Sequence, residues 1–249
     1  MIELKHISKT FNRSTSDPVV ALNDVNLTIA EKSFVVVVGA NGSGKSTLLN
    51  ALAGTVRIDE GQIMVDGTDI TKLNDHERSK WIARVFQNPV MGTAPELTVL
   101  ENFRLASLRT QSKGFRIGTG DAFKQTVKEK ISMLNLGLEN KIAQPMGTLS
   151  GGQRQALTLL MAVMDETKIL LMDEPSAALD PKTSELILQL ADKIIHEFNL
   201  TVLFVTHQLK DALHYGDRII RMSEGKIAED LSSDSKSNLK VEDVYRWFE

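Results

Sequence analysis

A glycine-rich segment, GANGSGKST, spans residues 39–47 and matches the phosphate-loop pattern G-x-x-x-x-G-K-[ST] at every fixed position. Its glycines let backbone N–H groups approach phosphate oxygens, because no Cβ stands in the way. The Lys45 side chain supplies a positive charge for the β and γ phosphates, and the Ser46 hydroxyl is a ligand for Mg²⁺. We therefore predict that phosphates bind at Gly39, Asn41, Gly42, Ser43, Gly44, Lys45, Ser46 and Thr47.

Two adjacent acids, Asp173 and Glu174, follow the apolar run ILLM. Such a run predicts a buried strand, and the carboxyl ends of strands are where open α/β folds bind ligands. A solvated turn before Pro175 is the alternative. Because a phosphate loop is also present, we expect Asp173 to hold the magnesium shell and Glu174 to polarise the attacking water.

His207 and Gln87 also stand at the ends of predicted strands, LTVLFVT and ARVF. A histidine in this position is often a hydrogen-bonded structural residue. If it lies at the same sheet edge as the acids, His207 can contact the γ-phosphate. The neutral amide of Gln87 can bind both metal and water, so both residues are candidates for the catalytic site.

A second candidate anion site is LSGGQRQ, at residues 149–155, where a serine and two glycines precede a helical pattern. The apolar positions that follow are expected to be ordinary core. Glycine reduces helix stability by up to about 1 kcal/mol relative to alanine, and the sequence offers no packing reason for two of them. We therefore predict that the segment binds an anion through Ser150, Gly151, Gly152 and Gln153.

Composition narrows the class of protein. The 249 residues contain no cysteine, which excludes disulfides and thiolate metal sites. No apolar run approaches the roughly 18 residues of a membrane span, and the first residues lack the pattern of a secretion signal. A formal charge of −3 gives no field that attracts nucleic acid, so no such partner is expected.

The order of the predicted elements indicates an α/β fold. Alternating segments at residues 1–11 and 19–30 are typical of half-buried antiparallel strands. The later strands alternate with helices, which favours right-handed βαβ units and a mostly parallel sheet. Strands are expected at 33–39, 61–67, 83–87, 168–174 and 200–207, and helices at 45–54, 97–106, 121–138 and 182–198. The remaining tail, 232–249, is expected to be a polar linker with one short helix.

Taken together, these motifs resemble the nucleotide-binding subunits of ABC transporters over essentially the whole chain. The family's motifs correspond to the phosphate loop, Gln87, LSGGQ, ILLMDE, the AALD segment at 177–180 and His207. The resemblance implies a P-loop ATPase with a mostly parallel core (1–87 and 165–230), including a lateral antiparallel β-subdomain. It also implies an inserted helical subdomain (88–164) and a tail (231–249). It places Phe11 against the adenine of ATP, with Mg²⁺ as cofactor.

The same resemblance implies the partners. In the family, two copies face head to tail. The LSGGQ segment of one copy, called the signature segment (149–153 here), closes over the ATP held by the phosphate loop of the other. Separate transmembrane permease subunits and an extracytoplasmic substrate-binding protein complete the expected assembly at the cytoplasmic face of the cell membrane. The chain is most similar to an import group labelled tryptophan/tyrosine transport, although that group commonly has histidine at Pro175. Ala177 replaces the usual serine of the AALD segment, which affects a contact between subunits.

Other interpretations stay open at this point. An ABC ATPase that transports nothing, such as an iron-sulphur assembly scaffold, has the same size. A binding module without activity is disfavoured because every catalytic position is filled. A basic stretch between Arg104 and Lys130 is either a solvated helical face or a surface for anionic lipid head groups; its basic residues are Arg104, Arg109, Lys113, Arg116, Lys124, Lys128 and Lys130.

Overall fold

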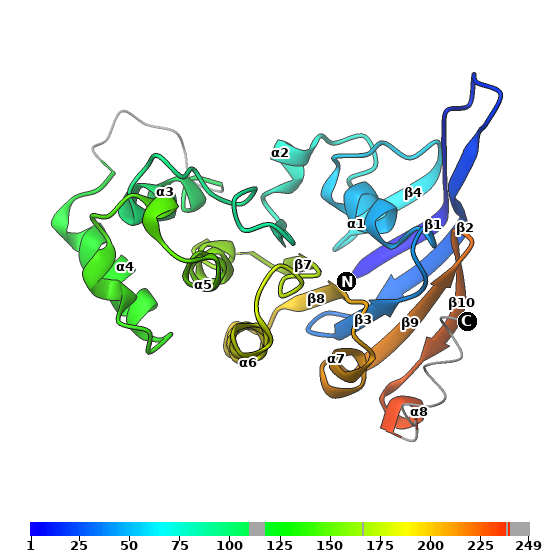
Figure 1. Cartoon of the computed structure of the whole chain (residues 1–249). Coiled ribbons are helices and arrows are strands. Elements are labelled where there is room, and N and C mark those ends of the chain that lie inside the picture. Colours follow the sequence, from blue (N-terminus) through cyan, green and yellow to red (C-terminus); the bar gives the residue numbers. More distant parts are fainter. Residues whose placement is uncertain (110–117, 166, 238, 240–249) are drawn as a thin grey trace. The chain divides into compact units, whose positions relative to one another are not determined.

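The computed structural model describes residues 1–109, 118–165, 167–237 and 239. The chain divides into two compact units, one of Met1–Ile82 with Leu200–Glu249 and the other of Ala83–Asn199 (Figure 1). Both units combine strands and helices, which confirms the α/β class. The finer division into a core, a helical subdomain and a tail stays a prediction.

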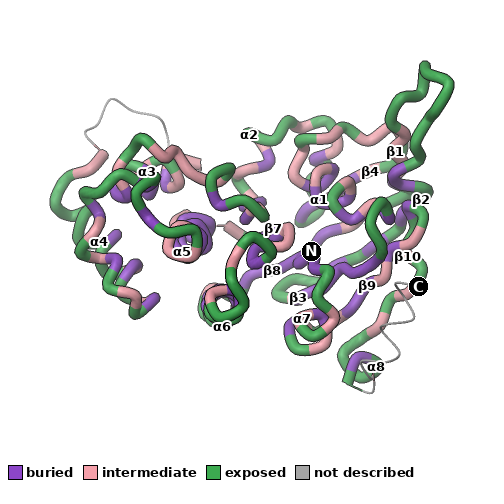
Figure 2. The backbone as a smooth tube through the Cα atoms, viewed as in Figure 1, coloured by how far each residue is buried: buried purple, intermediate pink, exposed green. Residues whose placement is uncertain are grey.

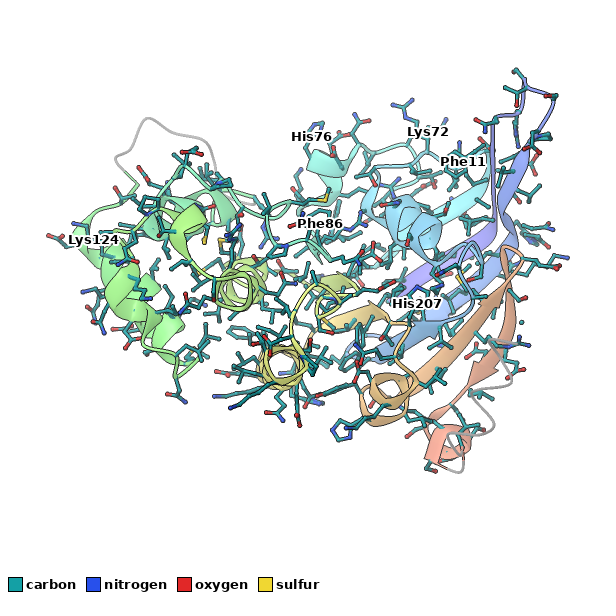
Figure 3. The ribbon with its side chains drawn as sticks, in the orientation of Figure 1. Phe11, Lys72, His76, Phe86, Lys124 and His207 are labelled. Carbon is teal, nitrogen blue, oxygen red and sulfur yellow. The ribbon has the colours of Figure 1, made fainter. Side chains whose placement is uncertain are left out.

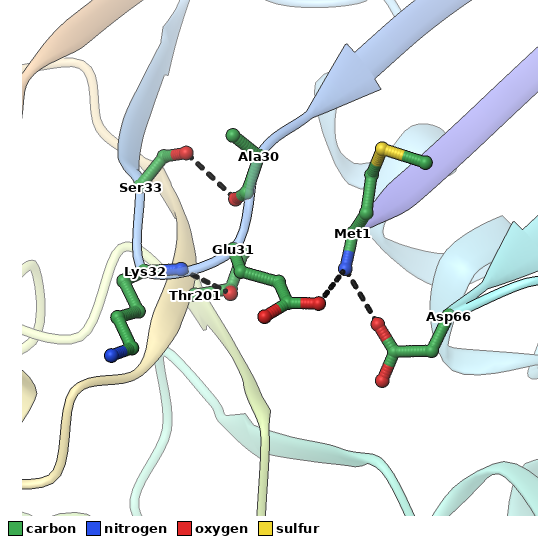
Figure 4. Close-up of polar contacts among 7 residues, drawn as sticks. All are labelled: Met1, Ala30, Glu31, Lys32, Ser33, Asp66 and Thr201. Atoms are coloured by element: carbon green, nitrogen blue, oxygen red, sulfur yellow. Dashed lines mark hydrogen bonds and ion pairs between the residues drawn. The ribbon is translucent and has the colours of Figure 1, made fainter.

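The first unit contains the expected antiparallel sheet. Its strands are β1 (Ile2–Phe11), β2 (Val19–Ile29), β4 (Glu60–Val65) and β5 (Thr68–Asp69), in the order β2-β1-β4-β5. The Met1 ammonium donates to Asp66 (2.6 Å) and Glu31 (3.3 Å), while the Lys32 N–H donates to Thr201 (Figure 4). These contacts fix the turn that leads out of β2.

The same unit holds parallel strands. β3 (Phe34–Val38) pairs in parallel with β8 (Thr201–Val205) on one side and β9 (Arg218–Ser223) on the other. All five residues of β3 and of β8 are buried, as a continuous apolar run predicts (Figure 2). β10 (Lys226–Leu231) then pairs antiparallel with β9.

The β9–β10 hairpin was not predicted from the sequence. Its turn is Glu224-Gly225, and both residues have positive φ (49° and 74°). Two-residue hairpin turns of this kind favour glycine, because its missing Cβ makes positive φ inexpensive. The Glu-Gly pair between two partly apolar segments is therefore the feature of the sequence that indicates this hairpin.

Short helices complete the first unit. α1 (Lys45–Ala53) matches the helix expected at 45–54, and Gly54, with φ +84°, is its C-cap. The others are α2 (Asp75–Arg78), α7 (Leu209–His214) and α8 (Ser233–Ser237). α8 lies within the tail 232–249, for which a polar linker and one short helix were expected, and most of the rest of that tail falls outside the described residues.

The second unit is mainly helical around two strands. β6 (Ile82–Val85), whose first residue belongs to the first unit, neighbours β7 (Ile169–Asp173). The α-helices are α3 (Val99–Ala106), α4 (Asp121–Ser132), α5 (Gly151–Ala162) and α6 (Pro181–Glu197), with 3-10 turns η1 (Leu138–Lys141) and η2 (Met146–Thr148). A capping box of Thr98 and Glu101 starts α3, within the helix expected at 97–106.

The basic stretch is not a uniform solvated face. Arg109 is partly buried, and its guanidinium donates to the carbonyls of Ala162 (2.7 Å) and Met161 (3.2 Å) at the end of α5. Arg104 lies over the Phe123 ring. Lys113 and Arg116 fall outside the described residues. Within the described part of the chain, no helix has the length and apolar character needed to cross a membrane.

Candidate functional site

The phosphate loop joins β3 to α1, and its glycines are required by the backbone. Gly39 and Gly44 have φ of +146° and +104°, values that L side chains rarely adopt. A Cβ on Gly39 would lie 2.2 Å from the Met222 carbonyl oxygen, and one on Gly44 would lie 2.4 Å from that of Ala21. No larger residue fits at either position, so the loop keeps its shape only with glycine.

Lys45 places its charge inside this loop. The side chain is buried, and its Nζ donates to the carbonyl oxygens of Gly39 (2.8 Å) and Ala40 (2.9 Å). Gly44 is the N-cap of α1 and cannot supply a side-chain cap. Positive charge and backbone N–H groups at a helix start together form a typical site for a phosphate. Asn41, Gly42 and Ser46 are exposed, while Ser43 is buried.

His207 lies at the same edge of the parallel sheet as this loop. β3 and β8 are parallel, and the chain continues from β3 into the loop and from β8 into His207. The Thr206 N–H donates to the Val37 carbonyl, which keeps the two strand ends together. His207 is exposed (Figure 3). The structure thus brings these two predicted parts together.

Phe11 ends β1 in the other sheet of this unit. Its ring is 37% exposed, and the Lys9 ammonium lies 5.3 Å from the ring centroid. A core aromatic would be buried, so this ring is available for stacking instead. Its role toward adenine stays a prediction.

In the second unit, the predicted metal ligand Asp173 is the last residue of β7. Its carboxylate accepts a hydrogen bond from Arg84 of β6, with Nη2 and Oδ2 2.8 Å apart. Glu174 follows with φ +46°, a left-handed conformation that is uncommon for residues other than glycine. Such backbone strain, about 1–3 kcal/mol, concentrates at functional sites. Gln87 follows β6, the strand that neighbours β7.

The signature segment starts α5 with a capping box. Ser150 Oγ accepts from the Gln153 N–H, and Gln153 Oε1 accepts from the Ser150 N–H, both at 3.3 Å. Gln153 therefore has a structural role at the helix start. Ser150 and Gly151 are exposed, where an incoming ligand can reach them.

Gly152 does have a packing reason, contrary to the prediction from the sequence. A Cβ there would lie 2.3 Å from Thr183 Cγ2 on α6, so close packing alone requires glycine. Asp180 caps the same helix, and hydrogen bonds from Thr183 lower the pKa of its carboxyl group. At Gly151 a Cβ would lie 3.3 Å from Leu179, a milder conflict.

Two residues that the sequence analysis did not identify support these parts. Arg84 contacts Asp173, and Gln155 donates from Nε2 to the Phe86 carbonyl (3.1 Å) immediately before Gln87. Arg84 could have been noticed as a charged residue within an apolar strand segment. Gln155 gave no signal, because polar residues are common on helices.

The residues predicted to hold a metal fit Mg²⁺ by their chemistry. Ser46, Gln87 and Asp173 offer hydroxyl, amide and carboxylate oxygens, which are the donors that Mg²⁺ prefers. Among the described residues, no group of three or more histidine, cysteine, aspartate or glutamate side chains could hold a metal. A single carboxylate matches the way proteins bind Mg²⁺ when phosphate oxygens provide further ligands.

Comparison with known families supplies the classification. Residues 22–177 match the family model described as ABC transporter. The chain belongs to the ABC transporter family. As an ATP-binding cassette of this family, it hydrolyses ATP.

Full-length relatives agree with the family. A tyrosine transport ATP-binding protein from Clostridioides difficile is 40% identical over 253 residues, covering 100% of this chain and 99% of that protein. A phosphonates import ATP-binding protein from Lactococcus lactis is 34% identical over 250 residues, covering 99% of each chain.

Solved ABC cassettes share the fold. One is the dimeric structure of a bacterial ABC transporter cassette, with a TM-score of 0.80 and 34% identity. Another is a dimeric post-hydrolysis state bound to ADP and Pi, with a TM-score of 0.78 and 33% identity. Each match covers 94% of this chain and 99% of the solved chain.

Proposed function

We propose that this ABC cassette powers the import of a small solute, with an aromatic amino acid as the first candidate. The observation that carries the proposal is the end-to-end similarity to a tyrosine transport ATP-binding protein. Relatives named for phosphonate and for spermidine/putrescine import support import as the direction. The specific solute depends on partner proteins.

The proposed residue roles follow the chemistry of the two units. Lys45 and the loop N–H groups bind phosphates, and Ser46, Gln87 and Asp173 supply oxygen ligands for Mg²⁺. Bound Mg²⁺ would neutralise phosphate charge. Glu174 orients and polarises the attacking water, and His207 contacts the γ-phosphate. Phe11 stacks on adenine.

We further propose that two copies hold ATP between them. Each chain has two helix starts suited to anions, α1 after Gly44 and α5 after Ser150. A head-to-tail dimer gives both a function, because Ser150, Gly151, Gly152 and Gln153 of one copy meet the nucleotide of the other. The dimeric cassettes of similar fold support this arrangement.

The remaining partners are transmembrane permease subunits and an extracytoplasmic substrate-binding protein, with this chain bound at the cytoplasmic face of the membrane. The test is to tag the chain in its native cell, purify it from detergent-solubilised membranes and identify what copurifies. The proposal predicts permease subunits in the complex, and ATP-dependent uptake of labelled tyrosine or tryptophan by vesicles that contain it. A complex without any membrane protein would contradict the transport role, and uptake of another solute would correct only the cargo.

A further inference from the structure

We propose that Arg84 is an internal competitor of the divalent cation for Asp173. The inference rests on the proposed role of Asp173 as a Mg²⁺ ligand. It assigns a function to a residue on the neighbouring strand, through an ion pair that links β6 to β7.

The geometry of the pair supports competition. Arg84 Nη2 lies 2.8 Å from Asp173 Oδ2, and the two side chains are only 13% and 17% exposed. Water therefore screens the charges incompletely. A divalent cation that approaches the same carboxylate is repelled by the guanidinium, so the two cations cannot both be held closely at low cost.

The Phe86 ring is a second partner of the guanidinium while it is paired with Asp173. The Arg84 Cζ lies 4.7 Å from the centroid of the Phe86 ring, within the range of a cation–π contact. The ring thus helps to hold the guanidinium beside Asp173. Phe86 directly precedes Gln87 in the chain, and the Phe86 backbone carbonyl accepts a hydrogen bond from Gln155. Arg84 is therefore held beside Asp173 by both the carboxylate and the ring.

Arg84 therefore lowers the affinity of Asp173 for a divalent cation below the value that an unpaired carboxylate would have. Arg84 keeps Asp173 paired until a cation displaces it, which protects the carboxylate from weakly bound ions. Arg84 is a positioning residue in this scheme, because it acts on the reaction through Asp173.

The test measures metal binding directly. Mn²⁺ is titrated into the protein at a fixed concentration of ADP, and free Mn²⁺ is followed by its electron paramagnetic resonance spectrum, with binding to ADP alone subtracted. Arg84→Gln is expected to bind Mn²⁺ about three- to tenfold more tightly than the wild type. Arg84→Lys, which keeps the charge, stays closer to the wild type. Arg57→Gln, a charge change at an exposed arginine that contacts Asn74, leaves the affinity unchanged.

Equal or weaker Mn²⁺ binding by Arg84→Gln would overturn the inference. Phe86→Leu provides an independent arm if Arg84→Gln does not fold, which circular dichroism shows. Removing the ring takes away a partner that the guanidinium has while it is paired, so Arg84 is held less firmly beside Asp173 and Mn²⁺ affinity rises. An unchanged or lower affinity in Phe86→Leu contradicts the proposal.

Asp173→Asn separates this inference from the proposed function. If it binds Mn²⁺ as tightly as the wild type, Asp173 is not a metal ligand and the assigned role fails. If it weakens binding, adding Arg84→Gln must then have no further effect. A persisting effect of Arg84→Gln in that background would show that the arginine acts elsewhere, and the inference alone would fall.

Discussion

Gln155 of α5 donates a hydrogen bond from Nε2 to the backbone carbonyl of Phe86, 3.1 Å away and 69 residues earlier in the chain. The Gln155 side chain is fully buried. α5 begins at the signature segment, and Phe86 directly precedes Gln87. One buried contact therefore ties the helix that presents Ser150 to the backbone that presents Gln87.

Replacing Gln155 by leucine should destabilise the protein. The substitution leaves the Phe86 carbonyl without this partner, which costs about 1–3 kcal/mol of unfolding free energy. Leucine also removes Gln155 Oε1, which is buried without a hydrogen-bond partner among the described residues, so the net loss should lie near the lower end of that range. Chemical denaturation followed by circular dichroism measures the loss. Gln125→Leu on exposed α4 is the matched control, because its amide contacts only the exposed Glu129 among the hydrogen bonds described. If both variants lost the same unfolding free energy, the hydrogen bond to Phe86 would contribute no more than an exposed one.

Lys45→Ala should lose most of its ATP affinity. The ammonium is buried within the phosphate loop and is held by two backbone carbonyls, where it can contact phosphates directly. Removing a charge-assisted contact of this kind costs about tenfold or more in affinity. Titration with a fluorescent ATP analogue measures the change, and Lys72→Ala, at an exposed lysine, serves as the control. Wild-type affinity in Lys45→Ala would remove the loop from nucleotide binding.

Glu174→Gln should bind ATP but hydrolyse it at least about a hundredfold more slowly. The amide keeps the shape of the side chain but cannot accept a proton from the attacking water. ATP should then trap a dimer, which size-exclusion chromatography with light scattering detects. Adding Ser150→Arg should prevent the trapped dimer, because a long charged side chain in the signature segment blocks the approach of the other copy. A double variant that still dimerises with ATP would argue against the head-to-tail arrangement.

The residues that could be predicted from the sequence are those whose chemistry depends on neighbours along the chain. The phosphate loop is contiguous, so its pattern is visible in the sequence, although the carbonyls that exclude a Cβ at Gly39 and Gly44 belong to Met222 and Ala21. Arg84 contacts Asp173 across 89 residues, so its role exists only once β6 lies beside β7. Gly152 was attributed to ligand binding alone, because the sequence does not reveal that Thr183 packs against it. The sequence pattern does not show which distant segments come into contact, so roles that depend on such contacts could not be predicted from it.

Gly152→Ala tests the two reasons for this glycine separately. The new Cβ would clash with Thr183 Cγ2, and we expect a loss of about 1–3 kcal/mol in unfolding free energy. Thr183→Ser removes that methyl group, so the double variant should regain the stability of Thr183→Ser alone. If the glycine also serves ATP-driven dimerisation, the double variant should be stable yet dimerise poorly with ATP. Full recovery of dimerisation would leave packing as the sole reason.

Asp211→Asn should stabilise the protein at neutral pH. Asp211 lies on α7, four residues after His207, and its Oδ2 is buried with no hydrogen-bond partner among the described residues. Burial raises the pKa of Asp211 above its ordinary value of 3.8, against smaller opposite effects of Lys210 and His214. The charged carboxylate therefore costs stability in the folded state, and the neutral amide removes that cost.

The pH dependence identifies this cause. The gain should be largest at neutral pH, shrink as the pH falls through the raised pKa, and vanish below 3.8, and because water screens this half-buried carboxylate it should stay under about 1 kcal/mol. Urea denaturation of both proteins between pH 3.5 and about 8 measures it. Asp17→Asn, at an exposed position, should show little difference at any pH. If Asp211→Asn is less stable than the wild type at pH 7, the carboxylate has a favourable partner, and the cost assigned to its burial is wrong.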